Sequence, residues 1–405
     1  MKNIALVGGG TLGHVTPNIA LVPELKKRGY NVIYIGEKNG AEEESVLRVA
    51  NIVYYGVTSD KLRRYHDFKN LLIPKNIIKG TLEATKVLKD NKIDIIFSKG
   101  GYVAVPVILA ASRMKIPIIS HESDLSLGLA NRIANRFSKI MCCNFKELAT
   151  KLKNGEYTGS PVREGLLDGS KEEGLKILGF KRNLPIILIM GGSSGSVFLN
   201  EVIRKNLDNL LPKYNIVHST GRKKINLNDY NDIEGYKQFE FINTDVLKHI
   251  LKASDLIISR AGANVIFEYL ALKKLHLLIP LSKRASRGDQ ILNAEIFVKE
   301  GFSEMITEED IELSNSLFLK KIDSLFENKN KYIKKMNEYN KENPINKICD
   351  IIDKYSGINN KKEIEDKKSN KNIMQAVNNK VDNNRIKKVN ELKDKIFNKI
   401  SLNKK

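Results

Sequence analysis

The sequence predicts an α/β protein with two nucleotide-fold halves and a cleft between them. Three observations support this. The chain has 405 residues, which suits two domains, and apolar strand-like runs alternate with helix-like stretches in both halves. Two glycine-rich turns, 8–14 and 191–196, each follow a buried apolar run and precede a helix-like stretch. Glycines allow the backbone to approach a ligand closely, and a helix N-terminus offers free N–H groups to an anion.

The first half, residues 1–160, is expected to form a doubly wound parallel sheet. Short runs rich in Ile, Val and Tyr predict its strands, and longer segments with helical spacing lie between them. The predicted strands are 3–7, 32–35, 52–55, 93–97, 116–120 and 139–142, and the predicted helices include 17–28 and 78–90.

The second half, residues 161–340, repeats this alternation after a predicted connector at 155–179. A terminal helix is expected at 341–356, within a charged helical stretch. Residues 357–405 form a basic tail rich in Lys and Asn, for which disorder is the default and a basic helix on an anionic membrane is the alternative. The predicted strands of the second half are 186–190, 215–219, 238–242, 256–259 and 275–279, and its helices include 198–210, 246–253 and 263–271.

Composition limits the classes of function. The formal net charge of +21 favours an acidic or phosphorylated partner, or else reflects an organism with Lys-rich proteins. The three cysteines have no CxxC spacing, so we expect a reduced compartment and no zinc site. We expect no signal peptide and no membrane span, because no apolar run approaches about 18–20 residues. A nucleic-acid-binding function is disfavoured, because aromatics are only 7% and no RNA- or DNA-binding motif is present.

Polar residues follow the predicted strands of the first half, at the edge where a ligand crevice is expected. Gly8, Gly10 and Gly13 match a dinucleotide-binding pattern, but His14 suggests a titratable group at the mouth of the cleft. His14 is a candidate general base, or alternatively a helix cap. The run 120–124 places His121, Glu122 and Asp124 at the same rim, where they would bind a sugar hydroxyl, transfer a proton or, less favoured, hold a metal.

The second half offers residues suited to a diphosphate and a sugar. Arg163 has the planar fork that binds phosphate oxygens, or is an ordinary surface arginine. The small residues of 259–264 allow a helix to begin close to an anion, and Glu268 within that helix would accept ribose hydroxyls. Gln290 is a candidate for sugar hydroxyls. No Asp-x-Asp triplet occurs, so we expect no metal and no cofactor at the diphosphate.

These motifs resemble, in order and spacing, the MurG family of N-acetylglucosaminyltransferases, which convert lipid I to lipid II in peptidoglycan synthesis. The matching segments are 8–17, 99–106, 121–131, 160–163, 191–196 and 259–268, and the resemblance covers about 1–352. It implies a GT-B fold, in which two Rossmann-like domains face a cleft, followed here by the basic tail. It also implies a peripheral enzyme on the cytoplasmic face of the cell membrane.

The resemblance assigns roles residue by residue. His14 and Glu122 become alternative catalytic bases, with His14 favoured. Leu12 replaces a glycine of the family loop, and Asp124 stands where some members have Asn. The substrate-binding residues that it implies, for UDP-GlcNAc above all, are Thr11, Leu12, Gly13, Asp124, Arg163, Ser193, Ile242, Ala263, Asn264, Glu268 and Gln290.

The expected reaction is an inverting transfer of GlcNAc from UDP-GlcNAc to the 4-hydroxyl of undecaprenyl-linked lipid I. The alternatives are a UDP-GlcNAc 2-epimerase and another lipid-acceptor GT-B glycosyltransferase. Anionic lipids of the inner leaflet are further expected partners, because cations are interleaved with apolar residues over 63–79. The residues of this patch are Arg63, Arg64, Phe68, Lys69, Leu71, Leu72, Ile73, Lys75, Ile77, Ile78 and Lys79.

Overall fold

The computed structural model describes residues 1–10, 12–40, 42–47, 51–60, 73–192, 195–222, 224–226, 230, 233–283, 288–339 and 342–358. The chain divides into a compact unit, Met1–Ile352, and a second unit, Asp353–Lys405, most of which lies outside the described residues. The predicted basic tail at 357–405 therefore has no described structure beyond residue 358.

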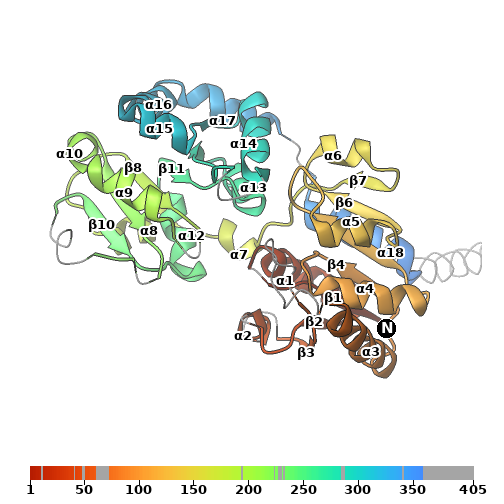
Figure 1. The fold of residues 1–405 in the computed structure, drawn as a ribbon. Coiled ribbons are helices and arrows are strands. Elements are labelled where there is room, and N and C mark those ends of the chain that lie inside the picture. Colours follow the sequence, from red (N-terminus) through yellow and green to blue (C-terminus); the bar gives the residue numbers. More distant parts are fainter. Residues whose placement is uncertain are drawn as a thin grey trace, which may run out of the picture. The chain divides into compact units, whose positions relative to one another are not determined.

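The first half of the compact unit contains a parallel sheet with the strand order β3-β2-β1-β4-β5-β6-β7 (Figure 1). The order reverses between β1 and β4, which creates the switch point where doubly wound sheets bind ligands. The strands are β1 Lys2–Val7, β2 Tyr30–Glu37, β3 Val53–Val57, β4 Ile95–Ser98, β5 Ile118–Glu122, β6 Ile140–Cys143 and β7 Gly155–Tyr157.

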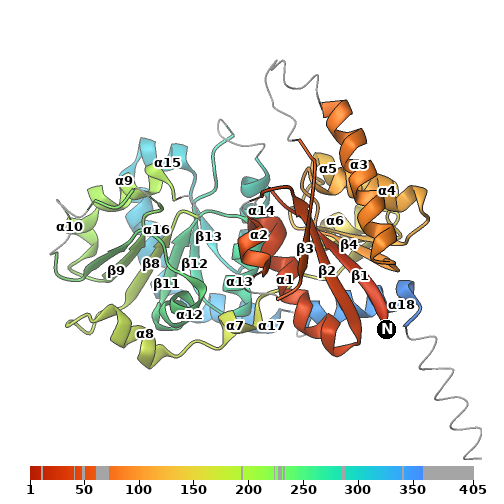
Figure 2. The ribbon, with the colours of Figure 1, turned by 90° about the horizontal axis from the view of Figure 1, so that it is seen from below.

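Helices connect these parallel strands, as the predicted alternation requires. In Figure 2, β1, β2 and β3 lie side by side, and α3 and α4 pack together beside them. The helices are α1 Leu12–Lys27, α2 Glu42–Ser45, α3 Ile73–Asp90, α4 Ala104–Arg113, α5 Leu129–Asn135 and α6 Lys146–Lys151.

The second half contains another parallel sheet, with the order β10-β9-β8-β11-β12-β13. Its switch point lies between β8 and β11. The strands are β8 Ile186–Met190, β9 Asn215–Ser219, β10 Tyr236–Phe239, β11 Leu256–Ser259, β12 Leu275–Leu278 and β13 Glu304–Met305. The helices are α7 Glu164–Leu167, α8 Lys171–Leu178, α9 Val197–Lys205, α10 Leu207–Leu210, α12 Thr244–Ala253, α13 Ala263–Ala271, α14 Asp289–Lys299, α15 Glu308–Leu313, α16 Asn315–Glu327, α17 Lys329–Glu338 and α18 Pro344–Ser356.

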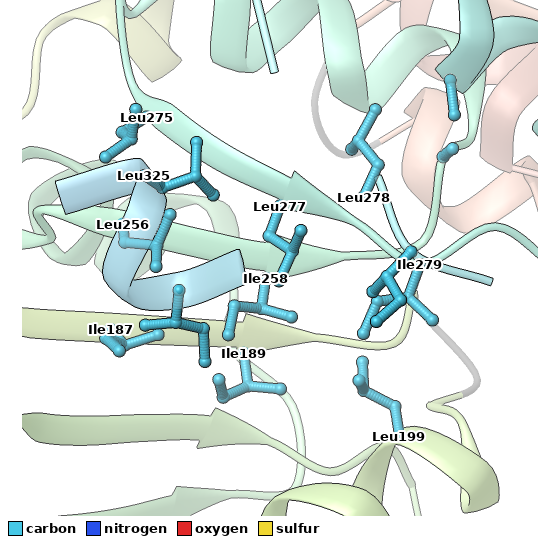
Figure 3. Packing of buried hydrophobic residues seen from close by; sticks show 14 of the residues in the cluster. Ile187, Ile189, Leu199, Leu256, Ile258, Leu275, Leu277, Leu278, Ile279 and Leu325 are labelled. Atoms are coloured by element: carbon cyan, nitrogen blue, oxygen red, sulfur yellow. The ribbon is translucent and has the colours of Figure 1, made fainter. Parts of the chain in front are cut away.

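The apolar core of the second sheet shows why these strands are almost continuously hydrophobic. Ile187 and Ile189 of β8 lie beside Leu256 and Ile258 of β11, and Leu325 of α16 packs in the same cluster (Figure 3). Strands buried on both faces need apolar side chains at successive positions rather than alternating ones. This core fixes the ends of β8 and β11, and so positions the loops that follow them.

Two predictions of local structure differ from the structure, and one strand was not predicted. The expected connector 155–179 contains β7, which pairs with β6, and the helices α7 and α8. The expected strand 238–242 occurs at 236–239, because its register is set by pairing with β9. Strand β13 was missed, since two residues carry too little periodicity to be recognised.

Helix α18 contacts the first half of the chain through an ion pair of 2.6 Å between Arg28 Nη1 and Asp350 Oδ1.

Candidate active site

Two glycine turns pack against each other at the switch point of the first sheet. The turn after β1 contains Gly9, and the turn after β4 contains Gly100 and Gly101, which have φ angles of +89° and +81°. A Cβ on Gly101 would lie 2.6 Å from the carbonyl oxygen of Gly9 and 3.3 Å from Cδ2 of His14. Only glycine combines this left-handed backbone with so close an approach. The second turn therefore supports the loop that presents His14.

A cavity of about 410 Å³ opens beside these turns. It is lined by His14, by Tyr102 after β4, by Glu122 and Asp124 after β5, and by apolar residues of α3 such as Ile77. One wall is thus polar and titratable, while other parts of the lining are apolar. Such a cavity suits a ligand that carries both hydroxyl groups and apolar surface.

His14 lies in the first turn of α1, and its ring Nδ1 is 3.2 Å from the backbone oxygen of Lys99. Since a carbonyl oxygen only accepts, Nδ1 must carry the proton and Nε2 remains an acceptor. Burial, and then the Lys99 ammonium, lower the pKa of His14, against the opposing influence of the Lys99 carbonyl, Asp124 and Glu42. His14 is therefore neutral near pH 7, with one nitrogen available as a base.

Glu122 has a different arrangement. Its Oε1 accepts from the backbone N–H groups of Ser123 at 2.9 Å and Asp124 at 3.1 Å. Its Oε2 accepts from the N–H of Gly128 at 3.0 Å and from Asn131 Nδ2 at 2.9 Å. A carboxylate engaged by four donors holds a loop in shape. Glu122 therefore organises the β5–α5 loop.

Asp124 joins this loop to α14. Asn293 Nδ2 donates to Asp124 Oδ1 at 3.0 Å, and Asn293 Oδ1 accepts from the N–H of Leu125 at 3.2 Å. Ser126 Oγ donates to Asp289 Oδ1 of the same helix at 2.8 Å. Burial, and then Glu122, raise the pKa of Asp124, while its bond from Asn293 lowers it.

Arg163 and Glu268, predicted for the diphosphate and the ribose, lie together. Arg163 Nη2 is 3.1 Å from Glu268 Oε1, and Arg163 Nη1 donates to Thr244 Oγ1 at 3.0 Å. Burial raises the pKa of Glu268, and Arg163 opposes that rise. The side chain of Ile242 is buried in the core beside β8 and α12, so only its backbone can face a ligand.

The other predicted residues of the second half lie at helix starts. Ala263 is the first residue of α13, whose N-cap, Gly262, provides no side-chain cap. Asn264 is the second residue, and its side chain is directed to residues of the first half rather than to solvent. Gln290 lies in the first turn of α14, where its Oε1 accepts from the N–H of Leu281 at 3.0 Å and its Nε2 remains to donate.

Some predictions concern residues outside the described part of the chain. These are the roles of Thr11 and Ser193 and most of the basic-apolar patch, Arg63, Arg64, Phe68, Lys69, Leu71 and Leu72. Leu12, which replaces a glycine of the family loop, is the first residue of α1 and is not among the residues with a positive φ. Gly13 follows it and is exposed.

Sequence reasoning missed the role of Lys99. Its side chain is fully buried, and its Nζ donates to His121 Nδ1 at 2.5 Å and to Ser123 Oγ. Burial lowers the pKa of Lys99 to about 7, against the opposing charges of Glu122 and Asp124. The Lys-Gly-Gly-Tyr turn marked this position as part of the crevice, but a lysine beside glycines carries no signal that its ammonium is buried.

Within the described ranges, no group of three or more His, Cys, Asp or Glu residues is arranged to hold a metal ion. A search of the same residues finds no helix with the length and hydrophobicity needed to cross a bilayer.

Comparison with known proteins identifies the family of this chain. The model of the glycosyltransferase family 28 N-terminal domain matches residues 4–142, and that of the C-terminal domain matches residues 186–352. The chain belongs to the MurG family within glycosyltransferase family 28. Its two parallel-sheet, Rossmann-like domains confirm the predicted α/β fold of the GT-B type.

Relatives support this membership over most of the chain. A Clostridium botulinum (strain Kyoto / Type A2) protein is 51% identical over 358 residues, which cover 88% of this chain and all of the relative. A Clostridium tetani protein is 50% identical over 361 residues, 89% of this chain and 99% of the relative. Both are named UDP-N-acetylglucosamine–N-acetylmuramyl-(pentapeptide) pyrophosphoryl-undecaprenol N-acetylglucosamine transferase.

Solved structures agree. The crystal structure of Acinetobacter baumannii MurG superposes with a TM-score of 0.66 at 26% identity, covering 87% of this chain and all of that one. A UDP-GlcNAc 2-epimerase from Neisseria meningitidis, bound to UDP-GlcNAc, has a TM-score of 0.59 at 18% identity, covering 85% and 96%. The second likeness reflects the shared fold alone.

Proposed function

We propose that this chain transfers GlcNAc from UDP-GlcNAc to the 4-hydroxyl of undecaprenyl-diphospho-N-acetylmuramoyl-pentapeptide, which converts lipid I to lipid II. The observation that carries the proposal is the identity of about half of all residues with enzymes named for this reaction, over their whole length. The cavity supports it locally, because it combines a neutral histidine with an apolar lining.

The chemistry follows from the placement of His14. The acceptor hydroxyl oxygen attacks the anomeric carbon of GlcNAc while the bond from that carbon to UDP breaks. The hydroxyl proton passes to His14 Nε2, which the Nδ1–H bond to Lys99 leaves free. Attack from the face opposite UDP inverts the anomeric centre. General-base assistance of this kind contributes about 10²–10⁴-fold in rate.

Donor recognition is assigned to the second half. The diphosphate lies at the start of α13, where backbone N–H groups and Arg163 stabilise the negative charge that grows on UDP. Glu268 accepts hydroxyls of the ribose, the backbone at Ile242 reads the uracil, and Nε2 of Gln290 donates to a hydroxyl of GlcNAc. Arg163 and Glu268 already pair in the absence of ligand, so donor binding replaces part of that contact.

Peripheral membrane binding is supported by one face of α3. Ile78 and Leu82 are 63% and 65% exposed there, and Lys75, Lys79 and Lys86 are exposed at the same helical spacing. Apolar side chains can enter the bilayer interface while the lysines meet anionic headgroups of the cytoplasmic leaflet, where each cation contributes about 1 kcal/mol. This face continues the predicted basic-apolar patch into described residues.

A transfer assay with radiolabelled UDP-GlcNAc tests the proposed reaction. The purified chain is incubated with lipid I, without lipid I, and with lipid I plus EDTA. We expect label in the lipid fraction in both arms with lipid I, because Arg163 and the start of α13 are proposed to stabilise the diphosphate in place of a metal ion. Release of ManNAc or UDP from the donor at the same rate without lipid I would instead indicate an epimerase.

A further inference from the structure

Four hydrogen bonds form a closed ring around the loop that holds His14. Lys99 Nζ donates to Ser123 Oγ, and Ser123 Oγ donates to Asn264 Oδ1 at 3.0 Å. Asn264 Nδ2 donates to the backbone oxygen of Gly13 at 2.8 Å. The next residue is His14, whose ring Nδ1 lies 3.2 Å from the backbone oxygen of Lys99. The ring therefore begins and ends at Lys99.

When Lys99 is charged, every proton in this ring has a single consistent position. An ammonium group only donates, so Ser123 Oγ must accept from Lys99 and has one proton left, for Asn264 Oδ1. This fixes the amide of Asn264, whose Nδ2 then faces the carbonyl of Gly13, a group that only accepts. The same constraint reaches His121, whose Nδ1 accepts from Lys99 and whose Nε2 donates to the backbone oxygen of Gly159 at 3.3 Å.

We infer that Asn264 is a positioning residue that ties the start of α13 to the loop carrying His14. The inference rests on the proposed function, in which that helix start holds the donor diphosphate and His14 is the base. The side chain of Asn264 accepts from Ser123 Oγ and, at 3.4 Å, from Ser160 Oγ, and it donates to the backbone oxygen of Gly13. Its backbone N–H, at the start of α13, is the group that meets the donor in the proposed function. A donor held at that N–H is thereby linked, through one side chain, to the residue next to the base.

A second set of contacts shows that Asn264 is not needed merely to hold the two halves together. Asn293 bonds Asp124 and the N–H of Leu125, and Ser126 bonds Asp289, all independently of Asn264. Removing the side chain of Asn264 leaves these contacts in place. The expected consequence is a displaced base loop within an otherwise intact protein.

The variant Asn264→Leu removes the side-chain hydrogen bonds with Ser123, Ser160 and Gly13 at nearly constant volume. Loss of one or two neutral hydrogen bonds corresponds to about tenfold, and misplacement of a reacting group to as much as about 10²-fold. We therefore expect kcat for transfer to lipid I to fall by about 10–100-fold, while the Kd for UDP changes by less than about twofold. The kcat of the Asn264→Asp variant should fall by a similar factor, because the second carboxylate oxygen would face the carbonyl oxygen of Gly13.

Two further variants separate positioning from general loss of structure. Ser123→Ala breaks the ring at another bond, and its combination with Asn264→Leu should be no slower than Asn264→Leu alone, because both act on one unit. Asn315→Leu removes an amide that exchanges two hydrogen bonds with Asn206, of 2.7 Å and 2.9 Å, far from this ring in the sequence. This control should leave kcat and the Kd for UDP unchanged.

The tautomer of His14 provides a readout that does not depend on turnover. In ¹⁵N-histidine NMR spectra of the free protein, assigned with a His14→Gln variant, we expect the Nδ1–H form in the wild type and a larger share of the Nε2–H form in Asn264→Leu. An unchanged tautomer together with an unchanged kcat would overturn the inference, as would a Kd for UDP that rises in step with the loss of turnover. A wild-type chain that transfers nothing would refute the proposed function instead, and the tautomer would still decide the role of Asn264.

Discussion

The variant Glu122→Gln distinguishes an organiser of the active-site loop from a catalytic base. Glu122 is buried, and its two oxygens accept four hydrogen bonds from the β5–α5 loop and α5. A glutamine has one oxygen, so it can keep only one pair of these donors. Its NH₂ group then faces the other pair, and the backbone N–H of Gly128 or of Ser123 cannot turn away.

The free energy of unfolding should fall accordingly. Two charge-assisted bonds are lost, and each loss costs about 1–3 kcal/mol, including the penalty for a buried N–H left without an acceptor. We expect a total loss of about 2–6 kcal/mol, which is a large share of the stability of a typical domain. Urea denaturation followed by circular dichroism measures this loss, and Glu201→Gln, on the exposed face of α9, is the matched control with no expected change.

Turnover gives the contrasting result. If Glu122 organises the loop, kcat falls together with a stability loss of this size. The pH dependence of kcat then still reflects the titration of His14. A variant as stable as the wild type but slower by 10² or more would refute this reasoning and make Glu122 the base.

Four other substitutions test the account. His14→Gln should lower kcat by about 10²–10⁴-fold without weakening UDP binding, as measured by lipid I turnover and calorimetry. Lys99→Met should move the acid limb of the pH profile of kcat/KM to higher pH. The ammonium of Lys99, which is charged below about pH 7, lowers the pKa of His14, so removing the ammonium raises that pKa. Ile78→Glu should weaken flotation with anionic vesicles while Leu313→Glu, which alters an 84% exposed leucine on α15, does not. Arg163→Ala should raise the Kd for UDP about tenfold or more, and a calorimetric Kd equal to that of the wild type would remove Arg163 from the donor site.

His14 and Lys99 both contribute to the pH dependence of stability. The folded protein lowers the pKa of His14, so the unfolded chain binds more protons and stability rises with pH up to the unfolded value near 6.5. Burial lowers the pKa of Lys99 to about 7, so its contribution to stability rises further between about pH 7 and 10.5.

Much of the fold could be predicted because each signal was local. Runs such as 186–190 and 256–259 are continuously apolar, and the structure buries them in the centre of the second sheet. The polar residues after β1 and β5 were predicted at a common rim because parallel strands end at the same edge. β7 was not predicted, because Gly-Glu-Tyr has strand geometry only through its pairing with β6.

Some residues that line the cavity could be predicted from the sequence, but their contacts with one another could not. His14 and Asp124 were found from their position after strands, and both line the cavity. The partner of each depends on contacts between segments far apart in the chain, such as Asn264 with Gly13, and no periodicity encodes those. Lys99 is the clearest case, since an isolated lysine usually lies on the surface and its burial depends on three separate loops.

The central claim is a single displacement in which the acceptor hydroxyl, deprotonated at His14, replaces UDP on GlcNAc. The most direct test is the anomeric configuration of the transferred GlcNAc, read from the proton coupling constant at its anomeric carbon in product made from lipid I. The mechanism predicts a β linkage from the α-linked donor. An α linkage would contradict it, because retention requires a second displacement that this arrangement does not provide.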